Sequence, residues 1–69
     1  MKNFTVRYTN DKTDVVESVT FILIGENDQL GNAYGEPWIF FYKTYPPTTY
    51  DDIVLLVRKV DVKSFRHQY

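Results

Sequence analysis

The sequence predicts a mainly β protein, a small twisted antiparallel meander or barrel of four to five strands. Apolar and polar residues alternate near the N-terminus, residues 38–42 are all apolar or aromatic, and β-branched residues concentrate in residues 53–62. Short apolar runs that are bounded by Gly, Pro, Asn and Asp are typical of strands. The 69 residues suffice for one domain at most, with a thin core, because so short a chain buries only ~60% of its surface. We therefore expect a single β-rich domain over residues 1–69, with its last few residues frayed.

The first expected strand covers residues 4–8, in which every second residue is apolar, as on a strand with one buried face. Residues 9–12 (TNDK) form a turn, because Asn and Asp adopt left-handed conformations readily and hydrogen-bond to their own backbone. Residues 15–24 then form one long strand, mixed in its first half and apolar on both faces in its second half. We expect this strand to leave an edge and enter the centre of the sheet.

Residues 25–36 form the next connection, which contains Gly31, Asn32 and Gly35, three residues for which a positive φ costs little. The connection is long for a hairpin in so small a domain, and long ordered loops often carry function. It is therefore the first candidate for a binding segment. Residues 38–42 (WIFFY) follow as the central strand, buried on both faces.

Residues 44–50 (TYPPTTY) form a stiff connector that favours the polyproline II conformation. Tyr45 precedes Pro46, and an aromatic residue at that position raises the chance of a cis peptide bond. Together with the loop at residues 25–36, the connector is expected to present a recognition surface.

The last third of the chain is expected to form strands. Residues 53–57 (IVLLV) match the apolar pattern of residues 38–42, and residues 60–64 alternate. A bulge near Arg58 and Lys59 is needed to change the buried face between the two segments.

The same third of the chain also fits a helix. Thr49 would be its N-cap with Asp52 three residues later, and an apolar stripe about 100° wide would follow. The alternative fold is therefore α+β, a three-stranded antiparallel sheet with a helix at about residues 49–60. The strand is favoured because the helix leaves Leu55 and Val62 on its polar side.

The composition predicts self-association rather than an ionic partner. A net charge of −1 gives no long-range field for nucleic acid or an anionic membrane. A thin core without cysteine, and so without disulfides, calls for stabilisation by a second copy, and we expect a homodimer. Residues 25–52 hold one lysine against five acidic residues, whereas residues 53–69 hold four cations against Asp61. An acidic middle and a basic end suit head-to-tail or antiparallel self-pairing.

No pattern in the sequence points to catalysis, to a metal or to a cofactor. His67, the single histidine, lies near the end of the chain, where a base for Ser64 would lack rigid support. Asp51 and Asp52 lack further acids at the spacing of a calcium loop. We therefore expect neither an enzyme nor a bound metal or cofactor. Without a signal sequence or an apolar run near the ~20 residues that span a bilayer, we expect a cytoplasmic protein that does not contact the membrane.

The six tyrosines predict a recognition surface, because a tyrosine ring can pack on one side and keep its hydroxyl in water. Such residues anchor protein interfaces. The predicted function is a non-enzymatic protein-binding module, in the manner of a small phage or mobile-element inhibitor or accessory subunit. The alternative is a single-stranded nucleic-acid-binding small β-barrel, in which the rings stack on bases beside Lys43 and the cations of the last third. The predicted binding residues are Tyr34, Trp38, Tyr45, Pro46, Pro47 and Tyr50.

Overall fold

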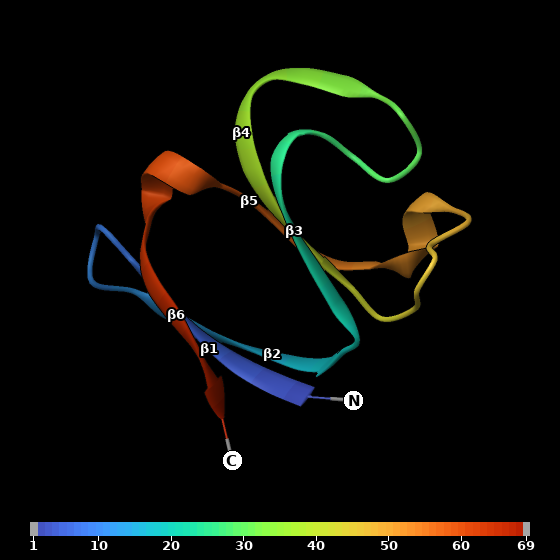
Figure 1. Cartoon of the computed structure of the whole chain (residues 1–69). Helices are drawn as coiled ribbons and strands as arrows, with labels where there is room; N and C mark the ends of the chain where they lie inside the picture. The colour runs from blue at the N-terminus through green and yellow to red at the C-terminus, as the bar shows by residue number, and fades with distance from the viewer. Residues whose placement is uncertain (1, 69) are drawn as a thin grey trace.

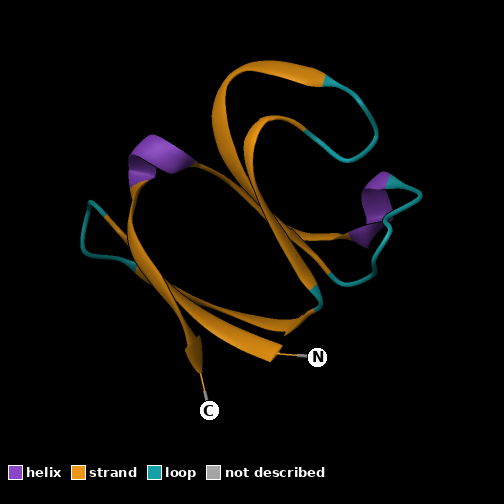
Figure 2. Cartoon of the chain, viewed as in Figure 1, coloured by secondary structure: helices purple, strands orange, loops and turns teal. Residues whose placement is uncertain are grey.

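The computed structural model describes residues 2–68, which form six strands in two three-stranded antiparallel sheets (Figure 1). The first sheet has the strand order β2-β1-β6, and the second sheet has the order β3-β4-β5. Two single turns of 3-10 helix, η1 (Tyr50–Asp52) and η2 (Lys59–Asp61), flank β5, and the described residues contain no α-helix (Figure 2). The strands are β1 (Lys2–Tyr8), β2 (Thr13–Val19), β3 (Phe21–Asn27), β4 (Ala33–Tyr42), β5 (Ile53–Arg58) and β6 (Val62–Gln68).

The mainly β prediction is confirmed, whereas the expected four to five strands and the barrel are not. Residues 2–68 contain six strands, and the two sheets do not close into a barrel. The chain passes from the first sheet to the second between β2 and β3 and returns between β5 and β6. A meander in one sheet would leave an apolar face of its central strand in water, whereas two facing sheets bury that face.

The single long strand expected at residues 15–24 is wrong, because the chain changes sheet within it. Thr20 separates β2 from β3, and Ser18, two residues earlier in β2, has a positive φ of 61°. The amide of Ser18 donates to Asn3 Oδ1 at 3.1 Å, and the amide of Thr20 donates to the Tyr42 carbonyl at 2.7 Å. The corner, residues 18–20, is thus hydrogen-bonded to the first sheet at Ser18 and to the second sheet at Thr20. It connects β2 to β3, which are both edge strands.

β4 is the central strand of the second sheet and is buried on both faces, as predicted for residues 38–42. Ile39 and Phe41 point between the sheets into the core. Phe40 and Tyr42 alternate with them and point to the outer face, yet they are only 0% and 1% exposed. A layer other than the first sheet must therefore cover the outer face. The first sheet contributes Val6, Val16 and Val19 to the core.

The C-terminal third forms strands, so the helix alternative for residues 49–60 is wrong. β5 pairs with β4, and Leu56 lies opposite Phe40. A strand covers the edge of β4 and directs apolar side chains to both faces of the sheet, which a helix with Leu55 on its polar side cannot do. Directly after Arg58, where a bulge was expected, η2 turns the chain into the first sheet.

The end of the β3–β4 hairpin curls back over the outer face of the second sheet (Figure 1). The connection expected at residues 25–36 is mostly strand, because β3 continues to Asn27 and β4 begins at Ala33. Only residues 28–32, the hairpin tip, connect them. β4 is bulged around Gly35, whose φ is 81°, and a bulge of this kind bends the strand.

Candidate functional site

Six aromatic rings form a continuous row on the outer face of the second sheet. Phe21 and Tyr42 lie opposite each other in β3 and β4, and their ring centroids are 5.9 Å apart. The row continues to Tyr45, 4.5 Å from Phe21, and in the other direction to Phe40, 6.1 Å from Tyr42. Each such ring pair contributes about 0.5–1.5 kcal/mol beyond its buried area. The aromatic row consists of Tyr45, Phe21, Tyr42, Phe40, Tyr34 and Trp38.

The hairpin tip is organised by Asp28, which is only 6% exposed. The backbone amides of Leu30 and Asn32 each donate to Oδ1 of Asp28 at 2.9 Å, and the Tyr34 hydroxyl donates to Oδ2 at 3.0 Å. The Asp28 amide in turn donates to the Asn32 carbonyl at 3.0 Å. A carboxylate with this many donors holds the turn in one conformation.

The same contacts shift the pKa values of the two side chains. Burial by itself raises the pKa of Asp28, but the hydrogen bonds from Asn32, Tyr34 and Leu30 favour the carboxylate and hold this pKa below its usual range. Burial and the bond to Asp28 raise the pKa of Tyr34 to about 12. At neutral pH the pair is therefore a carboxylate and a neutral hydroxyl, joined by a charge-assisted hydrogen bond.

Besides the bond from Tyr34, two hydrogen bonds join the hairpin tip to the connector and to the aromatic row. The side-chain amide of Asn32 donates to the hydroxyl of Tyr50, at the end of the connector. The backbone amide of Gln29 donates to the hydroxyl of Tyr42 at 3.2 Å, so the tip also rests on the aromatic row. The two segments that the sequence suggests as binding elements, the loop and the connector, are thus brought together in the fold.

The connector is closed by its own hydrogen bonds. Asp52 Oδ2 accepts from the backbone amides of Thr48 at 2.8 Å and Thr49 at 3.2 Å. These bonds hold the pKa of Asp52 below its usual range. The Thr49 and Asp52 pair, read in the sequence as a helix start, therefore caps η1 instead. The peptide bond between Tyr45 and Pro46 is cis.

The predicted binding residues lie at different depths. Tyr45 and Tyr50 are 59% and 54% exposed, and Pro46 is exposed next to Tyr45. The others are covered: Tyr34 and Trp38 are half-buried in the aromatic row, and Pro47 is buried.

Leu30, which is 37% exposed on the hairpin tip, is not among the binding residues that the sequence predicts. Its signal was available, because it is the one leucine in an otherwise polar stretch of Glu, Asn, Asp and Gln. The organising role of Asp28 was missed as well, since its donors come from the folded turn rather than from a motif. The exposed apolar and aromatic residues of the two joined segments are named the tip–connector surface, which consists of Leu30, Tyr45, Pro46 and Tyr50.

Of the cations that the nucleic-acid alternative requires, the exposed Lys43 directly precedes the connector, whereas Arg58 and Arg66 are placed differently. Arg58 Nε is 3.0 Å from Glu36 Oε1, so its charge is paired on the surface. Arg66 lies opposite Thr5 in the first sheet, whereas the aromatic row lies on the second sheet and its connector. Arg66 is therefore on a different sheet from the rings, and Arg58, which lies opposite Trp38, has its charge balanced by Glu36.

The remaining candidates for chemistry are placed in the sheets. His67 lies in β6 opposite Phe4, and the two ring centroids are 5.6 Å apart. Within residues 2–68, no three His, Cys, Asp or Glu side chains are grouped so that they could hold a metal ion. Over the same residues the structure has no helix of the length and hydropathy that crossing a membrane requires.

No protein-family model matches the chain, and neither the curated proteins nor the solved structures include a match. We therefore infer a function from the aromatic row and the tip–connector surface.

Proposed function

We propose that the chain is a non-enzymatic protein-binding module that contacts its partner through the tip–connector surface. The observation that carries this proposal is the exposure of Tyr45 and Tyr50, which leave more than half of their surface in water. Large aromatic side chains dominate binding energy at protein interfaces, because they bury much apolar area and have few rotamers to lose. Leu30, which is 37% exposed on the hairpin tip, adds an apolar side chain to the residues that a partner can contact.

The contacts beneath this surface support a recognition role. Tyr45 packs on Phe21, Tyr50 accepts a hydrogen bond from Asn32, and Asp28 fixes the turn. Side chains that are already ordered lose less entropy when a partner binds. A rigid aromatic surface of this kind favours binding without a large conformational change.

Within this class we propose a small inhibitor or accessory subunit, such as phages and mobile elements encode. The hairpin tip and the connector lie on the side of the molecule away from the β1–β2 turn (Figure 1). A small domain that presents rings at one side can attach to a larger protein and cover part of its surface.

A single-stranded nucleic-acid binder is less well supported. Stacking platforms work together with cations that follow the backbone of the strand. Here Arg66 lies on the first sheet and Arg58 is paired with Glu36, so neither accompanies Tyr45 or Tyr50.

The proposal is tested by affinity capture from a lysate of the source cells, followed by direct binding of the recovered protein to the purified chain. We expect the double variant Tyr45→Ala/Tyr50→Ala to weaken this binding at least tenfold, because each anchor contributes ~1 kcal/mol or more. Val15→Ala is the matched control, since Val15 is 56% exposed but lies on β2 in the first sheet. Circular dichroism shows whether each variant is folded.

Unchanged binding by a folded double variant would contradict the proposal. A mobility shift of a single-stranded oligonucleotide that falls steeply with salt would favour the nucleic-acid alternative instead.

A further inference from the structure

β5 is an edge strand whose apolar side chains are incompletely covered. Its first five residues (IVLLV) are all apolar, yet none is fully buried, and Val54 is 40% exposed. Among the strands of residues 2–68, only β4 pairs with β5, so the backbone donors and acceptors on its other side face away from the second sheet. β2 of the first sheet lies near Val54 and Leu55, where both strands line a small open pocket. An edge of this kind is a template for pairing with another strand.

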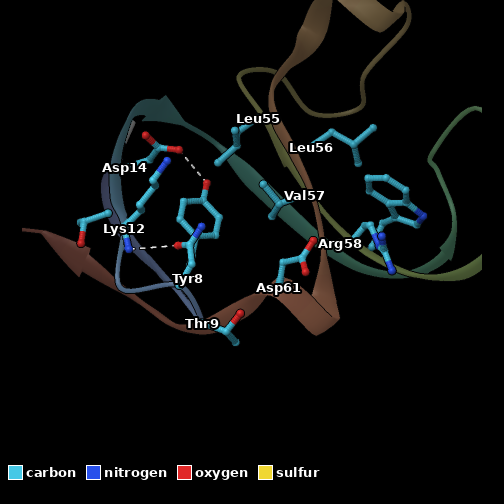
Figure 3. Close-up of a pocket in the computed structure, with 12 residues that line it drawn as sticks. Tyr8, Thr9, Lys12, Asp14, Leu55, Leu56, Val57, Arg58 and Asp61 are labelled. Atoms are coloured by element: carbon cyan, nitrogen blue, oxygen red, sulfur yellow. Dashed lines mark hydrogen bonds between the residues drawn. The ribbon is translucent and has the colours of Figure 1, made fainter.

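An open groove of about 870 Å³ runs beside this edge, between β5 and the turn that joins β1 to β2 (Figure 3). Leu55 and Val57 line it from the side of the core, because they lie opposite Phe41 and Ile39. Leu56 lies between them and belongs to the outer face. The side chains of a strand added beside β5 would likewise point alternately to the two faces of the sheet. Those on one face could contact Leu55 and Val57, and those on the other face could contact Leu56.

The charges around β5 are complementary to those of a second, antiparallel copy. Asp51 and Asp52 lie in η1, directly before the strand, whereas Arg58 ends the strand and Lys59 begins η2. If Leu55 lies opposite the partner's Leu55, the η1 end of one strand, which carries Asp51, lies beside the η2 end of its partner, which carries Lys59. Asp51 and Lys59 are both exposed, so they are accessible to such a partner. Opposite charges at both ends of a pair of strands set its register.

The other edge strands of the described sheets fit a second copy less well. β2 contains Asp14 and Glu17, and β6 contains Lys63 and Arg66, and charges within an edge strand discourage pairing. β3 is apolar in its first half, but its single charged residue is Glu26, so an antiparallel copy supplies no cation to face it.

We propose that β5 pairs with β5 of a second copy of this chain, forming a two-fold dimer with one continuous six-stranded sheet. The interface is isologous, so both copies use the same edge and the assembly closes at two. It goes beyond the proposed protein-binding function, and either can fail without the other.

Sedimentation equilibrium of the full chain over a range of concentrations tests the pairing. We expect a dimer, and we expect Asp51→Lys and Lys59→Asp each to raise its dissociation constant about tenfold, because two exposed ion pairs become repulsive. An equimolar mixture of the two variants should recover the wild-type dissociation constant. In that heterodimer Lys faces Asp again at both ends, which a merely structural effect of either substitution could not produce.

A charge in the middle of the edge gives a second test. Val54→Lys should dissociate the dimer, whereas the matched control Ile24→Lys, on the edge strand β3, should leave it intact. Should Val54→Lys fail to fold, the two charge reversals at exposed positions decide the matter.

A wild-type chain that stays monomeric at every concentration would overturn the proposal, and so would a dimer that the charge reversals leave unchanged. A monomer that binds an unrelated extended peptide along β5 would assign the edge to a foreign strand and exclude the second copy.

Discussion

The hydroxyl of Tyr34 donates a 3.0 Å hydrogen bond to the carboxylate of Asp28, and this bond joins the bulge of β4 to the hairpin tip. The Tyr34 ring lies 5.5 Å from Phe40, where it covers the outer face of the second sheet. Because Asp28 also holds the amides of the turn, one buried carboxylate links the conformation of the tip to the cover of the sheet.

Removing the Tyr34 hydroxyl should destabilise the protein without creating a cavity, because the ring remains. We expect Tyr34→Phe to lower the free energy of unfolding by about 1 kcal/mol, because a buried carboxylate loses one donor while the ring remains. Urea denaturation measures the change. Tyr45→Phe is the control, since its ring is 59% exposed and should leave the free energy of unfolding unaltered. Equal stability of Tyr34→Phe and wild type would show that the bond contributes nothing.

Acid should weaken the fold through Asp28. Its pKa is lower in the folded chain than in the unfolded chain, so its stabilisation is present above about pH 4 and is lost as the pH falls through the folded pKa. Urea denaturation at a series of acidic pH values should show a smaller loss for Asp28→Asn than for wild type. Part of the loss should persist in that variant, because the pKa of Asp52 is lowered as well. Parallel pH curves for the two proteins would refute the assignment.

Alkali should weaken the fold through Tyr8 and Tyr34. Burial, together with the bonds to Asp14 and Asp28, raises the pKa of each hydroxyl to about 12. The folded chain therefore keeps protons that the unfolded chain releases near pH 10, and this stability is lost as the pH rises from about 10 to about 12. The ultraviolet absorbance of tyrosinate follows the ionisation. A Tyr8→Phe/Tyr34→Phe variant should lose less stability over that range, and an equal loss would count against these two residues.

A glycine at position 18, where the chain approaches the passage between the two sheets, should stabilise the protein. Ser18 has a φ of 61°, which costs an L-residue about 1 kcal/mol or more but costs glycine little. We expect Ser18→Gly to raise the free energy of unfolding by about 0.5–1 kcal/mol, measured by thermal or urea denaturation. The neighbouring Glu17→Gly, at a residue of β2 whose φ is not positive, should lower it by a similar amount. A loss of stability in Ser18→Gly would mean that the Ser18 side chain stabilises the fold by more than its positive φ costs.

Much of the strand layout follows from short stretches of the sequence. Residues 38–42 are apolar on both faces, and only the middle of a covered sheet buries such a segment, as β4 shows. The strand at residues 53–57 was predictable for a related reason, since all five residues are apolar. In the fold their side chains point alternately to the two faces of the second sheet, where β5 pairs with β4. The division of residues 15–24 was not, because Ser18 is a common residue whose positive φ depends on the Asn3 side chain that accepts from its amide.

The candidate site was predictable as a set of residue types but not as a surface. The sequence by itself determined that this chain is mainly β, which residues form its central strand, and that tyrosines lie on both sides of that strand. Only the tertiary structure decided that Tyr45 and Tyr50 are exposed while Tyr34 is half-buried, and that Asn32 reaches Tyr50 across 18 residues of chain. The physical reason is that strand formation depends on the pattern of apolar and polar residues along a short stretch of chain, which the sequence displays directly. The contact between hairpin tip and connector depends instead on a bulge and a corner, whose geometry is set by partners distant in the chain.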